Sequence, residues 1–210
     1  IKNMGLTYSV ITVVNRDDMD DGGAHHYKKC IDKVHEICPK VGIEFLCSDL
    51  SGNVNALEFL LDNSPLTVFA HNVETVRRLT PRVRDPRATF DQSLLILKKA
   101  KDFRPDIITK TSIMLGLGET EEDLLSAFRE LRDAKVDLLT LGQYLSPGPR
   151  YHPVVSFPSP ETFDSLAQIA KEMGFKAIAS GPMVRSSYRA ESLVAAAKGE
   201  TFDIELKVVA

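Results

Sequence analysis

The sequence predicts an α/β fold, a partial (β/α) barrel in which parallel strands are covered by outer helices. Apolar runs rich in β-branched residues alternate about six times with longer amphipathic stretches, which is the pattern of βαβ units. Polar residues and glycines follow nearly every run, whereas an open doubly wound sheet, the alternative fold, gathers them at one switch point. The expected strands are Tyr8–Val14, Ile43–Cys47, Leu66–Ala70, Ile107–Leu115, Leu138–Leu141 and Lys176–Ala179.

Two of the intervening helices have recognisable ends. Thr120, followed three residues later by Asp123, predicts a helix that begins with a capping box. Ser159 and Pro160 suit the cap and the first position of a later helix, which Gly174 closes. Apolar residues at helical spacing between these signals predict that one face of each helix packs on the sheet.

Composition excludes several classes of protein. The chain has 210 residues, of which 43% are hydrophobic and 26% charged, so it is neither disordered nor collagenous. Its 26 basic and 29 acidic residues give a net charge of −3, which is not the basic field of a nucleic-acid binder. No apolar run approaches the ~20 residues of a membrane span, and the first residues do not form a signal peptide. We therefore expect a soluble protein with a cytoplasmic location.

The cysteines do not predict a metal site. Cys30, Cys38 and Cys47 are separated by eight and nine residues, which matches no zinc or iron–sulfur pattern. Cys30 falls on the apolar stripe of a helix, Cys38 at its end, and Cys47 at the end of an apolar run. We expect three buried or half-buried free thiols.

Polar segments at the strand ends form the candidate site. In a parallel barrel they open onto one face, and their amides, carboxylates, hydroxyls and arginines suit a polar ligand with several functional groups. Turn formation, helix capping and a hydrogen-bonded core histidine at His71 are the structural alternatives. No hydrolase or P-loop motif is present. The segments are 15–18, 20–23, 48–53, 71–75, 116–120, 143–147 and 180–188.

Five collinear motifs, read together, resemble the lipoyl synthase family of radical S-adenosylmethionine (SAM) enzymes. The resemblance extends from the first residues to about Ala190. It implies a radical SAM type of barrel. The matching stretches are VITVVNRDD (10–18) with DGGA (21–24), HNVETV (71–76) with RVR (82–84), TKTS (109–112) with MLGLGET (114–120), LGQYL (141–145), and ASGPMVRSSY (179–188).

The resemblance implies an activity and its cofactors. Lipoyl synthases insert two sulfur atoms at C6 and C8 of an octanoyl group carried on a lysine of a lipoyl-carrier protein. The resemblance implies two [4Fe–4S] clusters, one that cleaves SAM to a radical and one that supplies sulfur. It also implies an octanoylated glycine cleavage H protein or dehydrogenase E2 lipoyl domain as carrier, and ferredoxin or flavodoxin as electron donor.

Site residues transfer from the family by motif. Ser186 or Ser187, within Arg-Ser-Ser-Tyr, corresponds to the family's serine ligand of the auxiliary cluster. The expected contacts to SAM and substrate are Asn15, Arg16, Asn72, Glu74, Lys110, Ser112, Gly118 and Glu119.

The sequence departs from the family in its cysteines. The family binds its clusters through a Cys-x3-Cys-x2-Cys motif and three further cysteines, and none of the three cysteines present stands in either set. We therefore expect a C-terminal portion of the enzyme that is inactive in isolation, with barrel residues 1–190 and a tail at 191–210. The alternatives are an inactive truncated barrel or a carrier-protein binding module, and a mitochondrial or plastid location.

Overall fold

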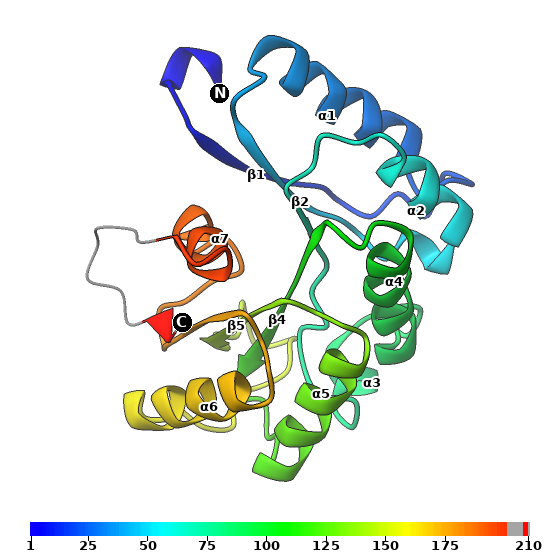
Figure 1. Ribbon diagram of the computed structural model, residues 1–210. Helices are drawn as coiled ribbons and strands as arrows, with labels where there is room; N and C mark the ends of the chain where they lie inside the picture. The colour runs from blue at the N-terminus through cyan, green and yellow to red at the C-terminus, as the bar shows by residue number, and fades with distance from the viewer. Residues whose placement is uncertain (201–207, 210) are drawn as a thin grey trace.

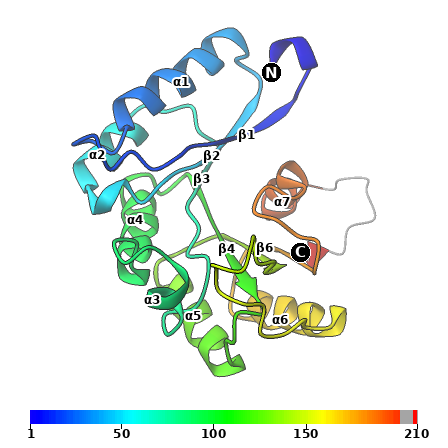
Figure 2. The same cartoon turned by 180° about the vertical axis from the view of Figure 1, so that it is seen from behind.

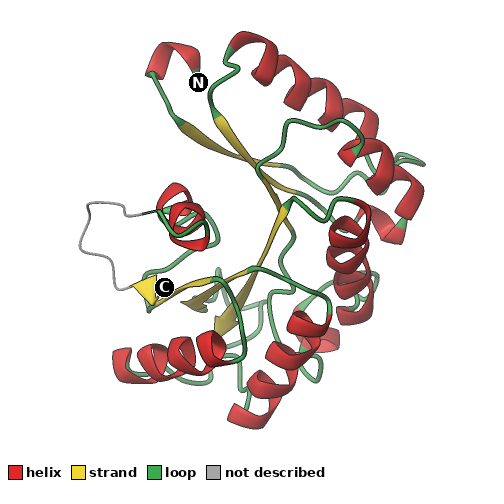
Figure 3. Cartoon of the chain, in the orientation of Figure 1, coloured by secondary structure: helices red, strands yellow, loops and turns green. Residues whose placement is uncertain are grey.

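The computed structural model describes residues 1–200 and 208–209. Its centre is a curved sheet with helices around the convex side (Figures 1 and 3). The strands lie side by side in chain order, the first six parallel and the seventh antiparallel to the sixth. The predicted α/β fold, a partial barrel with parallel strands, is thereby confirmed. The strands are β1 (Tyr8–Thr12), β2 (Gly42–Leu46), β3 (Val68–Ala70), β4 (Ile108–Leu115), β5 (Leu138–Gln143), β6 (Ala177–Ser180) and β7 (Val208–Val209).

Strand ends differ from the prediction where pairing sets the limit. β1 ends at Thr12, because its last ladder partner is Leu46, the final residue of β2. β5 continues to Gln143, because that residue pairs with Leu115 at the end of β4. A strand boundary therefore depends on a neighbour that is distant in sequence.

The helices begin where the capping residues predict. Thr120 and Asp123 form the reciprocal capping box of α5, and the Ser159 side chain caps α6, whose first residue is Pro160. These side chains satisfy N–H groups that have no partner inside the helix. The helices are α1 (Ala24–Ile37), α2 (Val54–Leu61), α3 (Thr80–Val83), α4 (Phe90–Phe103), α5 (Glu121–Asp133), α6 (Pro160–Glu172) and α7 (Ala190–Ala197), with short 3₁₀ turns at Lys2–Met4 and Leu50–Gly52.

The sheet has an apolar core on each face. Two apolar clusters, one with Phe45 and Phe69 and the other with Phe128, lie between the strands and the outer helices. On the inner face, Leu193 and Val194 of α7 join strand residues in a third cluster. Figure 2 shows α7 on the concave side of the sheet, opposite the other helices. The expected tail thus begins with a packed helix, and the boundary at residue 190 stays a prediction.

The expectation for Cys30 is wrong. Cys30 is exposed on α1, Cys38 is half-buried at its end, and Cys47 is buried after β2. The apolar stripe of α1 is carried inward by Ala24, Tyr27 and Ile31, and Cys30 lies outside it. Within residues 1–200 and 208–209, no helix is both long and apolar enough to cross a membrane.

Candidate active site

Asn72 and Glu74 lie together where β3 and β4 end. The Asn72 side-chain amide donates to Glu74 Oε1 at 3.1 Å. The Glu74 backbone N–H donates to the Ser112 carbonyl at 3.1 Å, and its own carbonyl accepts from Met114 N at 2.8 Å. Glu74 has a left-handed φ of 64°, which these backbone bonds hold in place. The structure therefore brings together three of the predicted residues, Asn72, Glu74 and Ser112.

The positive charge of Arg84 acts on the Glu74 carboxylate. Burial raises the pKa of Glu74, while the Asn72 amide and the charge of Arg84 act in the opposite direction. Burial also lowers the pKa of Arg84, whose guanidinium donates to Ser93 Oγ at 2.7 Å. The opposite charges favour the ionised form of both groups.

His71 completes a directed hydrogen-bond chain. Its Nε2 lies 2.9 Å from Ser93 Oγ, and its Nδ1 lies 3.0 Å from the Cys47 carbonyl. Because Arg84 donates to Ser93, the serine hydroxyl is left to donate to Nε2, and Nδ1–H donates to the carbonyl. Burial lowers the pKa of His71, consistent with this neutral tautomer. The structural alternative of a hydrogen-bonded core histidine is therefore the one observed.

Asn15 and Arg16 lie in the loop after β1. Arg16 forms an exposed ion pair with Asp18 at 2.6 Å. Asn15 is exposed and lines a hollow of about 490 Å³ together with Asp49 and Gln92. No described contact joins either residue to Asn72 or Glu74. Their role in SAM binding stays a prediction.

We call the strand ends at Asn72 and Glu74 the rim. Lys110 lies below this rim, on the inner face of β4. Its Nζ is 2.6 Å from Glu44 Oε1, and the Tyr8 hydroxyl donates to Glu44 Oε2 at 2.9 Å. Burial lowers the pKa of Lys110, although the nearby carboxylate opposes the shift. Burial and the same carboxylate raise the pKa of Tyr8. The three side chains form a buried polar cluster inside the barrel.

Gly118 and Glu119 shape the turn after β4. Both carboxylate oxygens of Glu119 accept backbone N–H groups, from Gly116 at 2.6 Å and Leu117 at 2.9 Å. Gly118 has a left-handed φ of 99°, and its carbonyl accepts from Arg78 at 2.8 Å. This arrangement supports the turn, and a direct ligand contact for either residue stays a prediction.

Ser186 and Ser187 lie in the loop that follows β6. Ser186 is half-buried and Ser187 is exposed. The loop crosses the end of β5, where a Cβ added to Gly142 would lie 2.2 Å from the Val184 carbonyl oxygen. Arg185 donates to the Val184 and Gln143 carbonyls at 2.9 and 3.4 Å. No described contact joins either serine to Asn72 or Glu74, so the cluster-ligand assignment stays a prediction.

The thiols do not fit an iron–sulfur cluster. They are dispersed over α1 and the end of β2, and burial raises the pKa of Cys47, which disfavours the thiolate. In the part of the chain that the structure describes, no three or more His, Cys, Asp or Glu side chains gather as a metal site would require. By contrast, the Glu74 carboxylate and the Asn72 amide fit the ammonium and hydroxyl groups of a nucleoside-linked amino acid such as SAM.

Sequence reasoning missed the residues that support the rim. Glu44 is a carboxylate within an otherwise apolar strand run, and this pattern could have indicated a buried ion pair. Arg84 belongs to the RVR motif (82–84), but the resemblance assigned it no role. Ser93 belongs to a helix, and nothing in the sequence around it indicates a hydrogen bond to His71.

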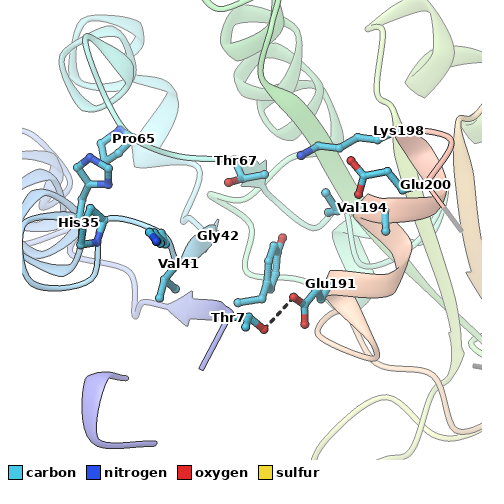
Figure 4. Close-up of a pocket in the computed structure, with 14 residues that line it drawn as sticks. Thr7, His35, Val41, Gly42, Pro65, Thr67, Glu191, Val194, Lys198 and Glu200 are labelled. Carbon is cyan, nitrogen blue, oxygen red and sulfur yellow. Dashed lines mark hydrogen bonds between the residues drawn. The ribbon is translucent and has the colours of Figure 1, made fainter. Parts of the chain in front are cut away.

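A second hollow lies at the opposite end of the barrel, between α7 and the amino ends of β1 to β3 (Figure 4). Its volume is about 410 Å³. The Thr7 hydroxyl donates to Glu191 Oε1 at 2.9 Å and links β1 to α7 there. Barrel enzymes place their chemistry at the carboxyl ends of the strands, so the rim at Asn72 and Glu74 is the better candidate.

Comparison with known proteins identifies the class. The Radical SAM superfamily profile matches residues 1–131, and the chain belongs to that superfamily. Its similarity within it is to lipoyl synthases, which confirms the resemblance predicted from the motifs. The *Thermus thermophilus* lipoyl synthase is 52% identical over 191 residues, which are 91% of this chain and 59% of the relative.

Two further relatives agree. The lipoyl synthase of *Marinobacter nauticus* is 51% identical over 91% of this chain and 55% of its own length. The apicoplast lipoyl synthase of *Toxoplasma gondii* is 53% identical over 88% of this chain and 34% of its own length. The chain thus spans at most 59% of these three relatives. A 2,3-dimethylmalate lyase structure, at a TM-score of 0.53 and 15% identity over 94% of this chain and 69% of its own, shares the fold alone.

Proposed function

We propose that this chain provides the barrel of a lipoyl synthase, which replaces C–H bonds at C6 and C8 of a protein-bound octanoyl group with C–S bonds. The observation that carries the proposal is the identity of 51 to 53% with three lipoyl synthases. The half-buried carboxylate of Glu74 and amide of Asn72 at the carboxyl ends of β3 and β4 support it, because they suit SAM.

The chain's own residues would hold SAM at the rim. Glu74 accepts hydrogen bonds from ammonium or hydroxyl groups, and Asn72 orients its carboxylate. The positive charge of Arg84 favours the ionised state of Glu74. Asn15, Arg16 and Ser112 complete the proposed contacts, with Lys110, Gly118 and Glu119 as weaker candidates.

The cluster thiolates would have to come from residues other than Cys30, Cys38 and Cys47, because these three do not converge. We therefore propose that the isolated chain does not insert sulfur. The same observation favours a second candidate function, an inactive barrel that only binds the carrier protein. Either Ser186 or Ser187 is proposed as the non-thiolate cluster ligand.

The proposed partners are an octanoylated H protein or E2 lipoyl domain and a ferredoxin or flavodoxin donor. The proposed location is the cytoplasm, with a mitochondrion or plastid as the alternative.

A chimera tests the proposal. The 191-residue segment of the *Thermus thermophilus* enzyme that matches this chain is replaced by the corresponding segment of this chain. After cluster reconstitution, we expect SAM cleavage and conversion of an octanoyl-lysyl peptide to the lipoyl form. The unmodified relative is the positive control. A folded chimera with both clusters but no product would reject the enzyme proposal and leave the binding module.

A further inference from the structure

Two neighbouring loops at the candidate site carry no acidic residue. The loop between β5 and α6 (residues 144–158) and the loop between β6 and α7 (181–189) contain Arg150, Arg185 and Arg189 but neither Asp nor Glu. The whole chain has a net charge of −3. We call residues 144–158 and 181–189 the β5–β6 loop surface.

The structure describes no ion pair for these three arginines in residues 1–200 and 208–209. In that described part of the chain, Arg82, Arg84, Arg129 and Arg132 do not form an ion pair either, whereas the other five arginines each do. Arg185 donates to backbone carbonyls, and Arg189 lies over the Tyr188 ring at 5.5 Å. Among the described residues, no carboxylate therefore forms an ion pair with the positive charges of this surface.

The same surface exposes large apolar side chains. Their exposed fractions are 57% for Leu145, 62% for Tyr151, 58% for Val155, 72% for Phe157 and 79% for Met183. In the described chain, the loops after β2, β3 and β4 expose no large hydrophobic residue, whereas the loop after β1 exposes Val14 and Met19. Apolar groups surrounded by charge of one sign are typical of protein interaction sites.

The two loops are contiguous over the ends of β4 to β6. Gln143 N donates to the Pro182 carbonyl at 3.4 Å, and Tyr144 N donates to the Leu115 carbonyl at 2.8 Å. Val155 N donates to the Gly116 carbonyl at 2.8 Å, which places the far part of the first loop on the turn after β4. The surface thus borders the strand ends where the candidate site lies.

We propose that the β5–β6 loop surface docks an acidic protein domain that presents the acyl-lysine substrate. The proposal rests on the proposed function, because that function requires an acyl group carried on a protein. The cationic charge selects an acidic partner, and the apolar side chains supply the buried centre of the contact. Docking here holds the carrier beside the strand ends that Asn72 and Glu74 mark.

Binding tests the surface directly. The probe is an octanoylated H protein of net negative charge, titrated onto the whole chain at low and at physiological salt. We expect Arg150→Glu and Phe157→Ser each to weaken binding about tenfold or more. Binding of the wild type should weaken as salt increases. Two matched controls should leave the affinity unchanged. They are Arg129→Glu, at an exposed position of α5, and Phe103→Ser, at the exposed end of α4.

The chimera separates this proposal from the proposed function. Arg150→Glu should reduce kcat/KM for the octanoylated H protein while leaving kcat/KM for a short octanoyl-lysyl peptide unchanged. A lower kcat/KM with both substrates would overturn the docking proposal, because it would indicate that further polypeptide of the enzyme covers this surface. An unchanged kcat/KM with both substrates would also overturn it. If the unsubstituted chimera is inactive, the proposed function fails while the binding result still decides the docking surface.

Discussion

The Lys110 ammonium lies 2.6 Å from Glu44 Oε1, and each of the two side chains is only 1% exposed. β2 and β4 supply the partners, which are 66 residues apart in the chain. Two charges removed from water are tolerated when each satisfies the other. The pair therefore couples the first half of the sheet to the second through the barrel interior.

Removing one member should be more harmful than removing both. We expect Lys110→Met or Glu44→Leu to lower the free energy of unfolding by about 3–5 kcal/mol, because an unpaired charge remains buried. The double variant should be more stable than either single one. Urea unfolding measures these differences, with the exposed Lys99→Met as control. If the loss of unfolding free energy in the double variant equals the sum of the losses in the two single variants, the two residues are not coupled.

Asp137 should make stability depend on acid pH. Burial alone raises its pKa, but hydrogen bonds from Lys101 and Lys176 outweigh burial, so the folded-state pKa is lowered. The group therefore stabilises the fold above its unfolded pKa of about 3.9, and the contribution is lost as pH falls through the lower folded pKa. Asp137→Asn should flatten the stability profile between about pH 5 and pH 2. If urea unfolding gives the same dependence of stability on acid pH for Asp137→Asn and for the wild type, this role is contradicted.

Gly142 should resist substitution because of its neighbour. A methyl group there would meet the Val184 carbonyl oxygen, so Gly142→Ala should cost about 1–3 kcal/mol and displace the loop after β6. Gly148→Ala is the matched control, since its nearest contact is Tyr151 at 3.9 Å. Thermal unfolding of both variants checks the difference. If Gly142→Ala and Gly148→Ala have comparable stability, the loop after β6 moves to accommodate the methyl group without strain.

Local sequence signals predicted much of the fold and less of the site. Strand positions and the caps at Thr120 and Ser159 are set by residues close in the chain. The Lys110–Glu44 pair and the Arg84–Ser93–His71 chain depend on contacts between separate elements, so periodicity does not reveal them. Motif resemblance located Asn72 and Glu74 without indicating that the charge of Arg84 acts on Glu74.

Asn72 and Glu74 should contribute to SAM affinity. In the reconstituted chimera, Asn72→Ala or Glu74→Ala should weaken SAM binding by about 1–3 kcal/mol, because each removes one partner of a partly buried polar contact. Equilibrium binding measures the change, with exposed Asn55→Ala as control. Wild-type affinity in both variants would remove these residues from the pocket.

Substitutions at Ser186 and Ser187 should distinguish SAM cleavage from sulfur insertion. If one of them binds the auxiliary cluster, its replacement by Ala should abolish or sharply slow lipoyl formation while SAM cleavage continues. Replacement by Cys provides a softer, tighter ligand and should also hinder the reaction. The same changes at the other serine are the internal control. Full lipoyl formation in both Ala variants would leave the motif with a purely structural role.

The position of α7 has a consequence for synthesis on the ribosome. Each strand from β2 to β6 joins the strand made just before it, so the sheet can grow as the chain emerges. The inner apolar surface, however, is covered by Leu193 and Val194, which are made after β6. At roughly 5–20 residues per second, the 20 residues between Ala177 and Ala197 take about one to four seconds. For at least that interval, the inner apolar side chains of the strands already made are not covered by α7.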